Sequence, residues 1–115
     1  MTSRKREDLP RRAHETAEAG HRESGALREV AEATRRSADA LREGAEAERR
    51  EAKANPNPHK AAARLYHADL KDQHAKALDD HARAIVTEAD SAEGNADIAE
   101  QRAELARGTG SSEPE

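Results

Sequence analysis

The sequence predicts an all-α protein, folded as a long antiparallel helical hairpin of the alanine-rich coiled-coil type. Alanine, the strongest helix former, occurs 26 times among the 115 residues. Two long segments without proline are separated by Asn55-Pro56-Asn57-Pro58. Within each segment, small and apolar residues recur at every seventh position, as they do along the contact face of paired helices. These three observations together favour two helices that pair side by side.

The first helix is predicted to follow a basic arm, residues 1–12. Pro10 argues against a helix that runs from the start of the chain, so we expect the arm to be disordered. The hairpin then occupies residues 13–107, with its turn at 55–58. Each proline of the turn lacks an N–H and disfavours helical geometry at the asparagine before it.

The end of the second helix is less regular. Glycine is a poor residue for a helix interior and asparagine is a good N-cap, so Gly94 and Asn95 favour a break. A short third helix would then run from 96 to 107, and the alternative is one continuous helix. Residues 108–115 are small and polar, and we expect a disordered tail.

Three neighbouring heptad columns form a weakly apolar face on the first helix. They begin at Ala17, Ala19 and Gly20, and the column from Ala19 is alanine at every position as far as Ala54. The opposite face is rich in arginine and glutamate, which suits a helix surface in contact with water.

The second helix has an unbroken alanine column from Ala61 to Ala103. Pairing the two helices around the turn would set Leu41 near Leu70. The larger residues expected to line an interaction seam are Leu27, Val30, Leu41, Leu70, Leu78, Ile85 and Val86.

Histidines also follow a heptad spacing. His67, His74 and His81 lie beside the expected apolar face of the second helix, and we interpret them as half-buried positions. Seven residues span about 10.5 Å of helix, so these histidines cannot share one metal ion. Burial disfavours the charged imidazole, so we expect weaker helicity or association at acidic pH than at mildly alkaline pH.

A second set of candidate metal ligands lies in the first helix. His14, Glu18 and His21 have offsets that place them on one helix face, and Glu18 to His21 matches the Glu-x-x-His element of di-iron bundles. The second helix offers no matching element. We therefore predict no metal site and no cofactor, with these three residues and the His67, His74 and His81 column as weak candidates.

Other function classes find little support. The chain has no cysteine, one tyrosine, no glycine-rich phosphate loop and no strand pattern, so an enzyme is not expected. Arg4, Lys5 and Arg6 could touch phosphates, but without aromatic residues any nucleic-acid binding would be weak and nonspecific. No apolar run is long enough to span a membrane, no secretory signal is visible, and we expect a cytoplasmic protein.

The alanine, glutamate and arginine heptads resemble coiled-coil stalks. The hydrophilic composition, poor in aromatic residues, is similar to that of the late-embryogenesis-abundant stress proteins. The helical members of that family have an 11-residue repeat, whereas the repeat in this sequence is seven residues long. That resemblance implies folding into helices on drying or binding. With only 11 Leu, Ile and Val residues, the core is small, and a partner would stabilise it.

The sequence therefore predicts a non-enzymatic helical module that binds another protein helix or itself, most simply as a homo-oligomer. One alternative is a conditionally folded protein of stress protection. The other is a helical bundle that responds to metal or pH through its histidines.

Overall fold

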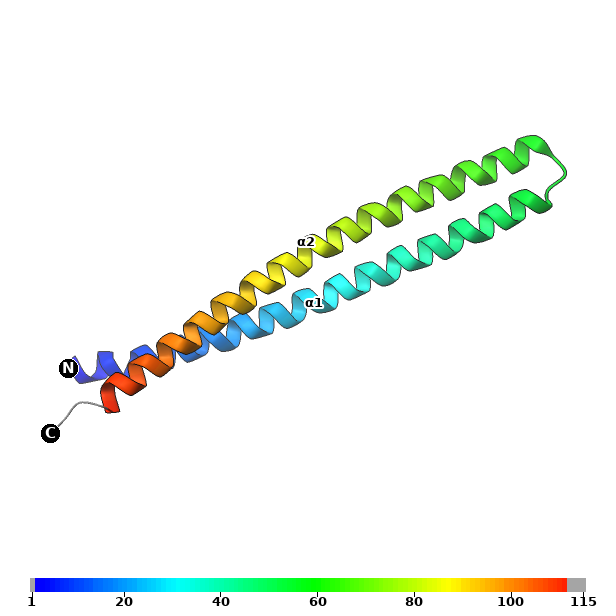
Figure 1. Ribbon diagram of the computed structural model, residues 1–115. Coiled ribbons are helices and arrows are strands. Elements are labelled where there is room, and N and C mark those ends of the chain that lie inside the picture. The colour runs from blue at the N-terminus through cyan, green and yellow to red at the C-terminus, as the bar shows by residue number, and fades with distance from the viewer. Residues whose placement is uncertain (1, 112–115) are drawn as a thin grey trace. The chain divides into compact units, whose positions relative to one another are not determined.

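The structure, a computed structural model, describes the backbone of residues 2–111 and the side chains of residues 9–108. The described part consists of two helices, α1 (Thr2–Ala54) and α2 (Pro58–Ser111), and contains no strand. Figure 1 shows the short turn that connects them. The predicted all-α fold, with two long helices and a turn at the Asn-Pro-Asn-Pro sequence, is confirmed.

Asparagine side chains shape the turn. The Oδ1 atom of Asn57 accepts hydrogen bonds from the backbone N–H groups of His59, at 3.0 Å, and Lys60, at 3.3 Å. These N–H groups belong to the first turn of α2, where no backbone carbonyl is available to them, so Asn57 is the N-cap of the helix. Pro58 follows as the first helical residue, the one position at which its missing N–H costs nothing. The Oδ1 atom of Asn55 accepts from the N–H of Asn57 at 2.9 Å.

α1 begins earlier than predicted. It starts at Thr2 and passes through Pro10, so most of the expected disordered arm is helical. A proline in a helix removes one backbone hydrogen bond and crowds the preceding turn. The helix continues through this proline because many good helix formers lie on either side of it.

α2 also continues where a break was considered. It runs through Gly94 and Asn95 to Ser111, so there is no separate third helix. Glycine lowers helix stability by only about 1 kcal/mol relative to alanine, which does not by itself end a packed helix. The predicted tail is therefore helical as far as Ser111, and residues 112–115 lie outside the described part.

The chain forms two compact units. Unit 1 combines Met1–Arg28 with Thr87–Glu115, and unit 2 is Glu29–Val86. In unit 2 the helices are joined directly by the turn, so they form an antiparallel hairpin.

Alanine fills the core of unit 2. Its buried apolar residues are Ala31, Ala38, Ala45, Ala52, Ala68, Ala75, Ala82 and Ile85. The alanines lie seven residues apart on each helix, as the heptad pattern predicts. A second column on each helix, which includes Leu41 and Leu78, is half-buried beside them.

Unit 1 has the same construction with even smaller side chains. Its buried residues are Ala17, Ser24, Ala89, Ala96, Ala99 and Ala103. The helices approach closely at Gly20, because a Cβ atom built on it would be 2.8 Å from the Cβ of Ala96. His21 pairs with Glu100, and the later residue Arg28 pairs with the earlier Asp90, so the two helices are antiparallel here as well.

The structure corrects which columns form the seam. The column that begins at Ala19 is mostly exposed, whereas the columns of Ala17 and Gly20 face α2. A two-helix seam takes two columns per helix, three residues apart, and leaves a third outside. The register also differs from the predicted one. Gly44, not Leu41, lies beside Lys71, and Leu70 remains 42% exposed.

Candidate functional site

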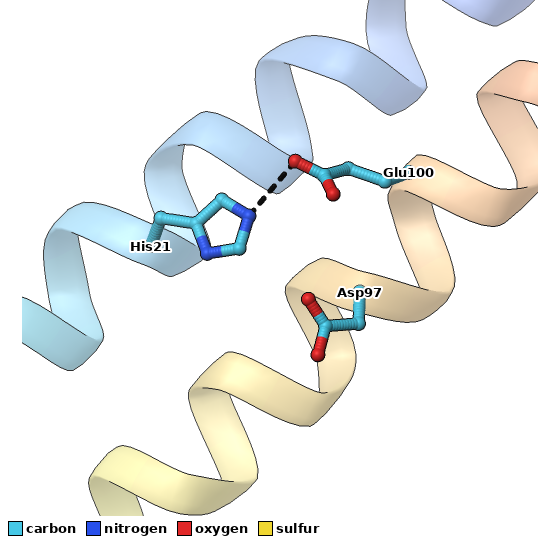
Figure 2. Close-up of side chains that lie close together, drawn as sticks. All are labelled: His21, Asp97 and Glu100. Carbon is cyan, nitrogen blue, oxygen red and sulfur yellow. Dashed lines mark hydrogen bonds and ion pairs between the residues drawn. The ribbon is translucent and has the colours of Figure 1, made fainter.

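A cluster of one histidine and three carboxylates joins the two helices of unit 1. Nδ1 of His21 lies 2.7 Å from Oε1 of Glu93, and Nε2 lies 2.9 Å from Oε1 of Glu100. Asp97 lies beside them, and one ligand atom each from His21, Asp97 and Glu100 lie within 4.8 Å of one another (Figure 2). We call these four residues the His21 cluster.

Local sequence explains how the cluster assembles. Glu93, Asp97 and Glu100 are spaced by four and three residues, which aligns them on one face of α2. His21 directly follows Gly20, where the two helices approach closely. The absence of a Cβ at Gly20 lets α2 come near enough for a short imidazole side chain to reach two carboxylates.

The carboxylates favour the charged form of His21. The hydrogen bond with Glu100 is the largest cause that raises the pKa of His21 above its ordinary value, and the bond and charge of Glu93 add to it. Desolvation acts in the opposite direction but is outweighed. An imidazole that donates from both ring nitrogens must carry both protons. Because both ring nitrogens lie beside carboxylate oxygens, this arrangement stabilises the doubly protonated imidazolium form of His21.

The candidate ligands predicted from the sequence are only partly brought together. Nε2 of His14 lies 3.0 Å from Oε1 of Glu18 on the same helix. His21, however, turns toward Glu93 and Glu100 of α2. The side chains of His14, Glu18 and His21 therefore do not converge on one position.

The predicted half-burial of the histidine column on α2 is wrong. His67, His74 and His81 are all exposed. Their column lies beside that of Leu78 and Ile85, on the side away from the buried column of Ala68, whereas the expectation had treated the exposed Leu70 column as part of the seam. The pH response expected from their burial therefore loses its basis.

The acidic half of the His21 cluster was missed in the sequence. Its signal was the spacing of Glu93, Asp97 and Glu100 on one helix face. That spacing indicates a ligand set only when the helix register places His21 opposite these three carboxylates, and the register is not evident from the sequence of either helix alone.

The predicted seam residues take three different positions. Ile85 is buried, while Leu27, Leu41, Leu78 and Val86 are half-buried. Val30 and Leu70 are exposed, at 52% and 42%. Arg4, Lys5 and Arg6, the predicted contacts to phosphate, lie outside the described side chains.

Ion pairs line one side of the seam in unit 2. Arg42 pairs with Asp79, and Arg49 pairs with Asp72 and, at 3.3 Å, with Asp69. On α1 these arginines follow the seam residues by one position, and so do Asp72 and Asp79 on α2. We call this flank the charged side of unit 2.

The opposite flank of the same unit carries no formally charged residue from Val30 to Ala47 on α1 and from Ala63 to Ala84 on α2 when histidine is neutral; nearer the turn, the same columns contain Glu51 and Lys60. On α1 this flank includes the heptad column of Ser37, one position before the buried Ala38. On α2 it includes the column of His74, one position before the buried Ala75. We call it the uncharged side. Its exposed members over these ranges are Val30, Ala33, Ser37, Ala40, Ala63, His67, Leu70, His74, Ala77, His81 and Ala84.

Near the turn, a carboxylate lies within the seam. The Glu48 side chain is only 18% exposed, and it accepts hydrogen bonds from Nζ of Lys71, at 3.3 Å, and from Arg64, at 3.4 Å. The bond from Lys71 is the largest cause that lowers the pKa of Glu48. With Asn55, Lys60 and other residues, these three line a shallow hollow at the end of unit 2.

Replacing Glu48 by Gln should lower the melting temperature at pH 7 because Lys71 and Arg64 lose their anionic partner. The folded pKa of Glu48 lies below its unfolded value of 4.5, so its stabilising effect is complete above pH 4.5 and disappears as the pH falls through the folded pKa. Thermal unfolding followed by circular dichroism should therefore show the two proteins converging in acid. Glu46→Gln, a change of equal charge at an exposed position, is the control. Equal losses for both variants would contradict this role of Glu48.

Fold and surface define the class: an alanine-seamed antiparallel helical hairpin. No helix of the described residues is long and apolar enough to cross a membrane. No protein-family model, curated protein or solved structure matches the chain. Its function must therefore be inferred from its own residues.

Proposed function

We propose that this protein is a non-enzymatic helical interaction module that associates with a second copy of itself through the uncharged side of unit 2. The observation that carries the proposal is the contrast between the two flanks of one hairpin. Charged residues make up 38% of the chain, yet all eleven exposed members of the uncharged side are apolar, small or histidine. A surface of that length without formal charges is unusual for a solvated helix pair.

The small core gives a reason for association. In unit 2 every buried apolar residue except Ile85 is an alanine. One methyl group contributes only about 0.8 kcal/mol when it is buried, so a two-helix seam of alanines is weakly stabilised. Covering a second face would add burial without any change in the fold, as in a four-helix bundle.

The shape of the surface favours a second copy over an unrelated partner. Within the seam, small residues of one helix leave room for larger residues of the other, and Ile85 and Leu78 belong to such a column. The uncharged side repeats this combination with exposed alanines, Ala33 and Ala40, on α1 and with Leu70 on α2. Each copy therefore offers both halves of an alanine and leucine heptad seam, and a two-fold dimer could use them reciprocally.

Ala77→Glu should abolish or strongly weaken this association because it places a carboxylate in the middle of the uncharged side. Ala62→Glu is the matched control, since Ala62 is also an exposed alanine of α2 but shares its heptad column with Asp69, on the charged side. Sedimentation velocity on both variants, with circular dichroism to confirm their helicity, measures the effect.

The expected result is a monomeric Ala77→Glu and an Ala62→Glu that associates like the unaltered protein. Equal association of the two variants would contradict the proposed surface. A stable monomer in all three proteins would contradict self-association and leave binding to a different helical partner as the function to pursue.

A further inference from the structure

We propose that the His21 cluster is a binding site for a divalent transition-metal ion such as zinc, with His21, Asp97 and Glu100 as ligands and Glu93 as the support of the imidazole. This site lies in unit 1 and goes beyond the proposed association through unit 2. It requires residues of both helices, so it differs from the group of ligands on α1 that the sequence suggested.

The distances within the cluster suit one ion. Zinc binds histidine nitrogen and carboxylate oxygen at about 2.0–2.2 Å, so neighbouring ligand atoms in a tetrahedral site lie about 3.3 Å apart. The ligand atoms of His21, Asp97 and Glu100 already lie within 4.8 Å of one another. Asp97 and Glu100 are exposed, and small side-chain rotations would bring their oxygens into range without movement of either helix.

The second nitrogen of His21 has the partner that metal-bound histidines usually have. A ligating imidazole commonly donates its other ring N–H to a carboxylate, which fixes the ring and makes the coordinating nitrogen more basic. The 2.7 Å contact between Nδ1 of His21 and Glu93 provides that arrangement, and Nε2, directed at Glu100, can bind the ion once it has released its proton to water. Figure 2 shows the ring between α1 and the acidic face of α2.

Local charge also favours a cation. Among the described residues, no lysine or arginine forms an ion pair with Glu93, Asp97 or Glu100, and the nearby Arg28 pairs with Asp90. In the described part of the chain, His21 is therefore the one basic side chain that pairs with these carboxylates. The nitrogen ligand points to zinc and its neighbours in the first transition row, because magnesium and calcium prefer sites made of oxygen alone.

The test is the affinity for zinc chloride, measured by equilibrium dialysis on the full chain. The expected result is one ion per chain for the unaltered protein, and a loss of affinity of more than tenfold for Asp97→Asn and His21→Gln. Glu93→Gln should weaken binding about 10- to 100-fold, as expected for a residue that supports a ligand. Circular dichroism confirms that the exposed substitutions leave the helices intact.

A variant with Gln at His67, His74 and His81 is the matched control, because these histidines are exposed and lie in unit 2. It should bind zinc with unchanged affinity. Zinc binding that survives in Asp97→Asn and His21→Gln, or that disappears only in this triple variant, would overturn the proposal. So would the absence of bound zinc in the unaltered protein.

Discussion

Ile85→Asp is expected to separate the two helices of unit 2. Ile85 is the only large side chain among its buried apolar residues, and it is 7% exposed. The change removes about 1.5–3 kcal/mol of apolar burial and places a carboxylate at a position that is largely removed from water, where a charge is costly. Because the other fully buried apolar residues of unit 2 are alanines, this loss is large. Far-ultraviolet circular dichroism should show a strong decrease in helicity at 25 °C.

Leu65→Asp is the control for this variant, because Leu65 lies on the same helix and is 46% exposed. It should retain nearly all of its helicity. If Ile85→Asp remained as helical as Leu65→Asp at every protein concentration, the seam would not hold the hairpin together.

Gly20 and Gly25 should respond in opposite ways to replacement by alanine. At Gly25 no atom lies within 4 Å of the added Cβ, so the variant should gain about 0.8–1 kcal/mol of helix propensity. At Gly20 the added Cβ would lie 2.8 Å from the Cβ of Ala96 and 3.3 Å from the backbone oxygen of Ala92. Neither atom belongs to a flexible side chain, so the helices must move apart.

Overpacking of this kind costs about 1–3 kcal/mol, which cancels or exceeds the gain in propensity at Gly20. Thermal unfolding should therefore place Gly25→Ala above the unaltered protein and Gly20→Ala at or below it. Equal stabilisation by both substitutions would show that the helices of unit 1 do not approach closely at Gly20.

Local signals were sufficient for the elements of the fold. The turn was predictable because prolines at 56 and 58 exclude a continuous helix and Asn57 is a strong N-cap. The heptad alanines of α2 were predictable as a contact column, and Ala68 to Ala103 are buried. These features depend on residues that are close in sequence.

The choice of seam on α1 and the register were not predictable in the same way. The columns of Ala17 and Ala19 contain side chains of nearly equal size, so hydrophobicity does not distinguish the buried one from the exposed one. Register depends on how closely the backbones approach, and Gly20 and Gly44 set that approach through contacts with the other helix. Gly20 allows a close contact with Ala96 that an alanine at this position would not.

The His21 cluster depends on that register and was missed for the same reason. A histidine on α1 and three acids on α2 become neighbours only when Gly20 is set against Ala96. The exposure of His67, His74 and His81 follows likewise from the position of the seam, one column away from the expected one.

Sedimentation velocity of the unaltered protein over a hundredfold range of concentration, with circular dichroism on the same samples, tests the central claim most directly. Self-association through the uncharged side predicts a mass that rises from one chain to at least two, with helicity constant or increasing. A chain that stays monomeric over the whole range would contradict the claim.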